Sequence, residues 1–333
     1  MTCVILTRGL LDRYVTEIVP RGEDMNSYSR TGRHEGQVAR FPAEVSRTPT
    51  QIGFKRILFA TDFSPSANAA LPYALGIARH YRSKLFAGHV ISEEKYLFTT
   101  SEDWPTALEQ VNSAQIEMYL KHSPRAMLSS VRDMPDVLFR LIHDSQIDLL
   151  VIGTRGRSGL PKLLLGSFAQ GIFREASIPV LTVGPNVSVP QTNIGEFSRI
   201  VFATDFSDQS IAAAAYALSV AKKYRALLSV LHVLEPPQSG TVDVEPLADF
   251  AIRRMWETVP RDADMSFRCP EYFVECGDVE EQVLKFAKLH QADLIVLGVR
   301  APERALSAIT RLAHSQAEHI VAQAPCPVLT VRG

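Results

Sequence analysis

The 333-residue sequence has few cysteines, no excess of charge of either sign and no long apolar run. None of its four cysteines forms a CxxC pair or accompanies a histidine cluster, which argues against a zinc site or a disulfide framework and favours the reducing cytoplasm. The 35 basic and 36 acidic residues give a net charge of -1, without the basic excess of nucleic-acid binders. No run approaches the roughly 18 apolar residues of a membrane span. We therefore expect neither a nucleic acid nor a membrane as a partner.

The composition is that of a globular protein, with 46% hydrophobic and 21% charged residues, and the length suits two domains. Residues 1–53 show little periodicity and lack the order of a signal peptide. We expect them to form a mostly disordered N-terminal extension, since termini are commonly unordered. A true start at Met25 and a regulatory tail are the alternatives.

An internal repeat organises the remaining chain. The segments 54–91 and 197–234 align without a gap, with about half of their positions identical. Further matches join 147–156 to 292–301 and 178–183 to 326–331. Two copies indicate domain duplication rather than a solenoid. The predicted domains are 54–184 and 197–333, and the Pro- and Asn-containing segment 185–196 is the predicted linker.

Each copy alternates apolar runs with helical patterns, which predicts parallel strands joined by helices. Strands are expected at 57–60, 85–90, 126–131, 149–152 and 180–183 in the first copy, and at 272–275 as the counterpart of the third. Helices are expected to follow Ser64 and Pro65, over 102–121, and after the N-caps Asp133 and Asp278. Pro72 lies within the first of these helices and could kink it. Ligands on such sheets bind beyond the carboxyl ends of the strands.

A glycine-containing loop, GTRGRSGLPKLLLGS over residues 153–167, follows the fourth strand. Glycine lets the backbone turn sharply and approach a ligand closely. Gly166 and Ser167 open the expected helix 168–175, whose N-terminus offers free N–H groups to a phosphate. Arg155, Arg157 and Lys162 add positive charge for a polyphosphate, although a solvated loop would carry the same residues.

The ATDFS strand end, the DLLVIGTRG strand and this loop together resemble the ATP-binding branch of the universal stress protein family, over residues 54–332. The resemblance implies two tandem Rossmann-like domains of the adenine nucleotide alpha hydrolase type, each a five-stranded parallel sheet flanked by helices. It implies ATP as ligand, with Mg²⁺ only as carried by the nucleotide. It also implies that strands 180–183 and 328–331 pair in an intramolecular pseudo-dimer, with further homo-oligomers open.

By the same resemblance, one acidic residue contacts the adenosine, apolar residues flank the base, and the loop holds ribose and phosphates. The residues so implied, with their neighbours, are Ala60, Thr61, Asp62, Val90, Ile152, Gly153, Arg155, Gly156, Gly166, Ser167 and Phe168. Asp62 has a counterpart, Asp205, so a purely structural role in the strand–helix turn is the alternative. His89 and His232 also match and are expected to pack rather than to act as acid or base.

The second copy departs from the loop pattern. Ala301 replaces the second glycine, and His314 and Ser315 stand where Gly166 and Ser167 stand in the first copy. The loop is also longer and contains Pro302 and Glu303. We therefore expect this copy to bind nucleotide poorly or not at all.

Three functions fit these observations. The first is a nucleotide-binding stress or regulatory protein without fast chemistry. The second is a slow ATPase or nucleotidyl transferase, although the loop supplies neither a water-orienting base nor a carboxylate for Mg²⁺, and no GxxxxGK[ST] loop occurs. The third is a ligand-free interaction scaffold.

Overall fold

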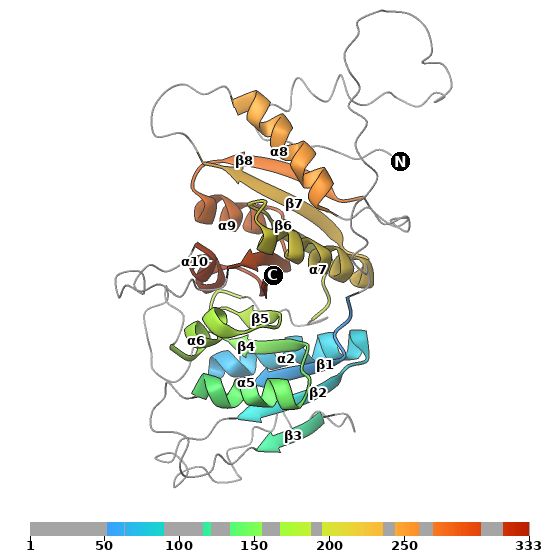
Figure 1. Ribbon diagram of the computed structural model, residues 1–333, viewed down its shortest axis with the longest axis vertical. Coiled ribbons are helices and arrows are strands. Elements are labelled where there is room, and N and C mark those ends of the chain that lie inside the picture. Colours follow the sequence, from blue (N-terminus) through green and yellow to red (C-terminus); the bar gives the residue numbers. More distant parts are fainter. Residues whose placement is uncertain are drawn as a thin grey trace, which may run out of the picture.

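The computed structural model describes residues 52–62, 64–89, 116–120, 134–154, 167–187, 195–235, 244–259, 269–300 and 316–332. Strands and helices alternate along these residues to form two lobes (Figure 1). The first lobe contains β1 (Arg56–Ala60), α2 (Pro65–Tyr81), β2 (Lys84–His89), β3 (Ile116–Leu120), α5 (Met134–Asp144), β4 (Leu149–Gly153), α6 (Ser167–Glu175) and β5 (Val180–Val183). The second contains β6 (Arg199–Ala203), α7 (Asp208–Tyr224), β7 (Leu227–Leu234), α8 (Val244–Thr258), β8 (Glu271–Cys276), α9 (Val279–Leu289), β9 (Leu294–Val299), α10 (Gln316–Gln323) and β10 (Val328–Arg332).

The described strands form one sheet in the order β3-β2-β1-β4-β5-β10-β9-β6-β7-β8. The pairs within each lobe are parallel. The lobes join where β5 runs antiparallel to β10, with Leu181 opposite Leu329. The predicted class, two α/β lobes of five parallel strands each, is confirmed, and so is the predicted pairing of the two last strands.

Both faces of the sheet are buried, which explains why its central strands are continuous apolar runs. Ile57 and Phe59 of β1 belong to a core that includes residues of α2, α7 and α8. Leu58 and Ala60 point to the opposite face, whose core includes residues of α5, α6, α9 and α10. Each core contains side chains from both lobes, so the apolar contacts continue across the junction.

The first long helix of each lobe begins and ends in the same way. Ser64 caps α2 by accepting a hydrogen bond from the amide of Ala67 at 3.2 Å, which confirms the predicted N-cap. Ser207 caps α7 in the same manner. Both helices stop at an arginine in the left-handed conformation, Arg82 and Arg225, with φ of 58° and 54°.

Two further helix predictions can be compared with the structure. The helix α2 runs through Pro72 from residue 65 to residue 81. Asp278 is the N-cap of α9 as predicted, and its carboxylate accepts from the amide of Glu281 at 2.9 Å. The corresponding cap at Asp133 lies outside the described residues.

The predicted helix over 102–121 is wrong at its C-terminal end, because residues 116–120 form β3, parallel to β2. Ile116, Met118 and Leu120 alternate with Glu117 and Tyr119, which is the period of a strand. This third strand takes the place that the sequence analysis gave to residues 126–131, which lie outside the described residues, as does 102–115. Its counterpart in the second lobe, β8, includes the strand predicted at residues 272–275.

The lobes also meet through α2 and α7. The imidazole of His80 stacks on the ring of Tyr224, with centroids 3.9 Å apart. Its Nε2 donates a hydrogen bond to the carbonyl oxygen of Lys223 at 2.9 Å. In the part of the chain that the structure describes, no helix combines the length and apolar character needed to cross a membrane.

Candidate functional site

The carboxyl end of β1 brings three predicted site residues together. Ala60 and Thr61 are buried, and the amide of Thr61 donates to the carbonyl of Gly88 at the end of β2 at 2.9 Å. Oδ1 of Asp62 accepts from the amide of Ser64 at 2.9 Å and so closes the turn into α2. This turn-closing contact is the structural role that the sequence analysis kept as the alternative for Asp62.

The end of β4 lies beside the end of β1, since Phe59 pairs with Val151 in parallel register. Ile152, the predicted neighbour of the base, is buried. A Cβ on Gly153 would lie 2.4 Å from the carbonyl oxygen of Ser66 in α2. The missing side chain of Gly153 therefore lets the first turn of α2 approach the strand, a reason for glycine that the sequence analysis did not foresee.

The loop that follows β4 lies largely outside the described residues. Arg155, Gly156 and Gly166 of this loop, and Val90 after β2, lie outside the described residues, so their predicted roles stay predictions. The structure resumes at Ser167, where α6 begins as expected for the residue after the last loop glycine. Phe168 is partly buried and packs against the core on that face of the sheet. The loop thus runs from the carboxyl end of β4 to the N-terminus of α6.

A cleft of about 490 Å³ occurs at the corresponding edge of the second lobe. Its walls come from the ends of β6, β7 and β9 and from the starts of α7, α9 and α10. The lining residues are Ala203, Thr204, Asp205, Ser210, Leu231, His232, Val233, Leu234, Glu235, Val279, Val283, Leu297, Gly298, Arg300, Gln316, Ala317 and Ile320. This volume is within the range of about 300–1,000 Å³ that is usual for small-molecule pockets.

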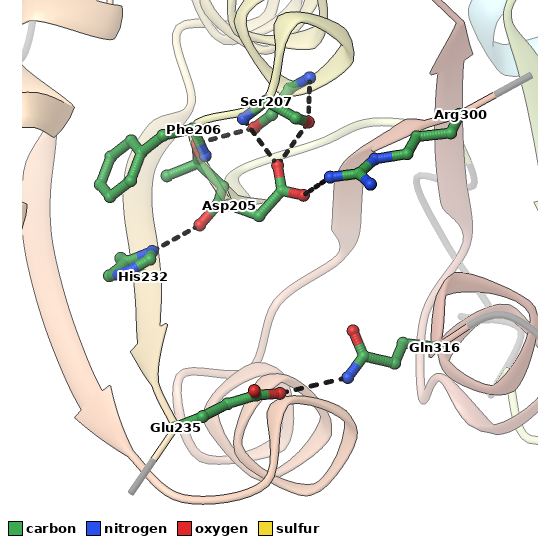
Figure 2. Close-up of polar contacts among 9 residues, drawn as sticks. Asp205, Phe206, Ser207, His232, Glu235, Arg300 and Gln316 are labelled. Carbon is green, nitrogen blue, oxygen red and sulfur yellow. Dashed lines mark hydrogen bonds and ion pairs between the residues drawn. The ribbon is translucent and has the colours of Figure 1, made fainter. Parts of the chain in front are cut away.

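Asp205, the counterpart of Asp62, holds the turn at one side of this cleft (Figure 2). Its Oδ1 accepts from the amide of Ser207 at 3.0 Å and from the hydroxyl of Ser207 at 2.6 Å. Its Oδ2 lies 3.7 Å from a guanidinium nitrogen of Arg300, and both side chains are more than half exposed. An exposed pair at this distance contributes little stability.

His232 lies in the last part of β7 and lines the same cleft. Its Nδ1 is 2.8 Å from the carbonyl oxygen of Thr204, which can only accept, so Nδ1 carries the hydrogen. The ring also packs on Phe206, with centroids 4.3 Å apart. Burial lowers the pKa of His232, against smaller opposing effects of the Thr204 hydrogen bond and the charge of Asp205. These contacts support the expected packing role; the side chain of the matching His89 lies outside the described residues.

Glu235 and Gln316 form a contact that the sequence analysis missed. The amide nitrogen Nε2 of Gln316, the first residue of α10, donates to Oε1 of Glu235 at 3.4 Å (Figure 2). Glu235 follows the end of β7, at the position that Ser92 occupies in the first copy. In the sequence, this replacement of serine by glutamate was the one sign of the contact, and it lay outside the loop motif that guided the prediction.

Metal binding receives no support from the described residues, among which no three His, Cys, Asp or Glu side chains are grouped to hold an ion.

Gly298 repeats the packing role of Gly153, because a Cβ there would lie 2.5 Å from the amide nitrogen of Ser210 in α7. Ala301, His314 and Ser315, on which the expected weakness of the second phosphate loop depends, lie outside the described ranges.

Comparison with known proteins agrees with this architecture. A universal stress protein of Thermus aquaticus is 34% identical over 150 residues, which are 41% of this chain and 99% of that protein. One from Methanocaldococcus jannaschii is 27% identical over 139 residues, 39% of this chain and 82% of that protein. The crystal structure of a universal stress protein from Archaeoglobus fulgidus has a TM-score of 0.60 at 22% identity, covering 83% of this chain and 98% of the other.

The family assignment follows from a match that covers both lobes. The model of the universal stress protein family matches residues 53–184 and again residues 196–332. The two matches together include most of the chain and fall on the two halves of the sheet. The chain therefore belongs to the universal stress protein family, as a member with two tandem domains.

Proposed function

We propose that the first lobe binds an adenine nucleotide such as ATP and that the protein acts in stress response or regulation through this binding. The observation that carries the proposal is the loop of residues 153–167, which leads from the carboxyl end of β4 to the N-terminus of α6. Such a position is where nucleotides bind on parallel sheets, since free N–H groups at a helix start attract phosphate.

The described residues can supply the rest of such a site. Buried Ala60 and Ile152 are apolar residues at the ends of two neighbouring strands, at positions that the family resemblance gives to the nucleotide. Asp62 can both close the strand–helix turn and contact the ligand, the two roles that the sequence left open. Its Oδ1 closes the turn, and a carboxylate has a second oxygen that can accept from a ribose hydroxyl. Arg155 and Gly156 would extend the site along the phosphates.

We further propose that the two lobes act as a pseudo-dimer in which only the first binds nucleotide. The pairing of β5 with β10 joins the two sheets within one chain. In the second lobe Ala301 and His314 replace the glycines Gly156 and Gly166 in the aligned sequence, and Glu235 brings a carboxylate to the start of α10. A negative charge there opposes phosphate.

Binding without fast chemistry is the form of the proposal that the residues favour. Phosphoryl transfer needs a residue that orients the attacking group and a carboxylate that holds Mg²⁺. The loop of residues 153–167 contains neither an aspartate, a glutamate nor a histidine, so Mg²⁺ would enter only with the nucleotide. A single-turnover assay with radiolabelled ATP tests this form. Product formation faster than the uncatalysed reaction would favour the slow-ATPase alternative.

Isothermal titration of the full chain with ATP tests the site itself. We expect about one nucleotide per chain, and we expect Gly166→Asp to abolish the heat because it places bulk and negative charge among the phosphate-binding amides. The matched control is His314→Asp, the same change at the corresponding position of the second lobe, which should leave the titration unchanged. Equal effects of the two variants, or two nucleotides per chain, would refute the assignment to the first lobe.

Mass spectrometry of ligands released from the purified protein is the complementary measurement. An adenine nucleotide in the native preparation, absent from Gly166→Asp and present in His314→Asp, is the expected result. A native protein that neither carries nor titrates with any nucleotide would favour the third function, the interaction scaffold.

A further inference from the structure

The cleft of the second lobe differs from a phosphate site in the charge of its lining. Its ionisable carboxylates are Asp205 and Glu235, and its one guanidinium is that of Arg300, which gives a formal sum of -1 over the described lining residues. The matching positions of the first lobe hold Asp62, Ser92 and Arg155, with a formal sum of zero. The difference comes from Glu235 alone.

Two hydrogen-bond donors at the cleft are directed at these carboxylates. The guanidinium of Arg300 lies 3.7 Å from Asp205, and the side-chain amide of Gln316 donates to Glu235 at 3.4 Å (Figure 2). Each carboxylate oxygen can accept more than one hydrogen bond, whereas a phosphate would add negative charge beside described lining residues whose formal charges already sum to -1. The lining therefore favours a ligand that donates hydrogen bonds.

His232 adds another acceptor to the lining. Because its Nδ1–H donates to the carbonyl of Thr204, the neutral ring presents a lone pair on Nε2. The burial of the ring disfavours a second proton there. Three acceptor side chains, from the ends of β6 and β7, thus lie around one cleft.

The remaining wall of the cleft is apolar. Ala203 and Leu234 at the ends of β6 and β7, Val279 of α9 and Ala317 of α10 line it and are partly exposed. Such a surface takes up the hydrocarbon or aromatic part of a ligand. The arrangement combines an apolar wall with an acceptor-rich rim, which is the usual composition of a small-molecule site.

We propose that this cleft binds a small organic cation with an apolar body, and that Glu235 selects the positive charge and excludes phosphate-bearing ligands. The second lobe is then a site of different specificity rather than a degenerate copy of the first. This inference does not depend on nucleotide binding by the first lobe, because it uses only residues of the second.

The test compares two probes of the same shape, tyramine and 4-ethylphenol, of which only tyramine carries an ammonium group. Chemical shifts of the full-length, isotope-labelled chain are followed during titration with each. We expect tyramine to shift the signals of Asp205, His232 and Gln316 and to bind more tightly than 4-ethylphenol by about fivefold, the effect of one partly screened charge pair. Equal affinities, shifts confined to other parts of the molecule, or no binding of tyramine at millimolar concentration would overturn the proposal.

Two variants assign the selection to one residue. Glu235→Ser, which restores the residue of the first copy, should lower tyramine affinity to that of 4-ethylphenol without changing the affinity of 4-ethylphenol. The control Glu257→Ser removes the same charge from an exposed position on α8, away from the cleft, and should leave both affinities unchanged. An unchanged preference in Glu235→Ser, or the same loss in both variants, would overturn the role of Glu235. ATP titration of the native chain reports separately on the first lobe, whereas ATP titration of Glu235→Ser tests the exclusion of phosphate: a gain in nucleotide binding over the native chain is expected, and no gain would overturn that part of the proposal.

Discussion

The carboxylates of Asp148 in the first lobe and Asp293 in the second make the same contacts. Asp148 accepts from the amides of Lys55 and Arg56 at 2.7 and 3.0 Å, where β1 begins. Asp293 accepts from the two matching amides at the start of β6, at 2.7 and 3.1 Å. The serine caps, the left-handed arginines and the strand-end glycines repeat in the same way. The contacts at the starts of β1 and β6 and at the junctions between strands and helices are therefore the same in the two lobes.

The lobes differ where a ligand would lie. The loop after the fourth strand loses two glycines in the second copy, and Glu235 and Gln316 stand at the positions of Ser92 and Phe168. Residues that match in both lobes, such as Asp62 and Asp205, share a turn-closing contact and so are explained by the fold. Residues that differ are the better guide to specificity. The predictions below test whether the shared residues have equal structural effects in the two lobes.

The largest shared effect is expected at the strand-end glycines. The substitutions Gly153→Ala and Gly298→Ala each place a Cβ within 2.5 Å of backbone atoms of the adjacent helix, where no side-chain rotation relieves the contact. We expect each to lower the free energy of unfolding by about 3 kcal/mol, measured by urea denaturation. Gly53→Ala is the control, because a Cβ there meets no heavy atom within 4 Å. If either strand-end variant is as stable as the control, the packing argument for that lobe is wrong.

A smaller shared effect is expected at the aspartates that cap β1 and β6. Asp148→Ala and Asp293→Ala each leave two amides without their acceptor, and we expect a loss of about 2 kcal/mol in each lobe by urea denaturation. The conservative variants Asp148→Asn and Asp293→Asn keep one acceptor oxygen and remove a charge whose burial raises the pKa of each group, so they should cost less. A larger loss from asparagine than from alanine would contradict this account.

The framework was predictable from the sequence because its signals are local or repeat within the chain. Continuous apolar runs such as 57–60 indicate strands buried on both faces, and Ser64 followed by Pro65 indicates a helix start. The strand β3 was missed because its five residues alternate between apolar and more polar side chains instead of forming such a run, and they lie within a segment of helical character.

The candidate site was less predictable, because its contacts join distant residues. The pairing of Glu235 with Gln316 spans 81 positions, and neither residue belongs to a motif. The close approach of Gly153 to Ser66 likewise depends on how α2 lies across β4. The sequence indicated glycine at this position, but its close packing against α2 became visible only in the fold.

The helix caps should have equal and moderate effects. Ser64→Ala and Ser207→Ala each remove the side-chain acceptor for an amide in the first helical turn, and we expect a loss of about 1 kcal/mol in each case. Thermal unfolding followed by circular dichroism measures it. The replacements Ser64→Asp and Ser207→Asp retain an acceptor and should recover most of the loss. If aspartate were no better than alanine, the serines would act through packing rather than through their hydroxyl oxygens.

The smallest effect is expected on the pH dependence of stability, and it belongs to the second lobe. Burial holds the pKa of His232 below its ordinary value of about 6.5, so the unfolded chain binds a proton at this residue more readily than the folded chain. The contribution of His232 to stability is therefore fully present above about pH 6.5 and declines as the pH falls below it. We expect this decline to be less than about 1 kcal/mol, because solvent partly screens the ring.

The variant His232→Asn isolates this decline, because its amide nitrogen can still donate to the carbonyl of Thr204 while the titratable ring is lost. Melting temperatures at pH 7.5 and 5.5 should differ less in His232→Asn than in the native chain. His143→Asn, at a side chain that is 91% exposed, is the control and should keep the native difference. If His232→Asn keeps it as well, the ring of His232 gains its proton as easily in the folded lobe as in the unfolded chain. His232 would then not be available as a neutral hydrogen-bond acceptor at the cleft of the second lobe.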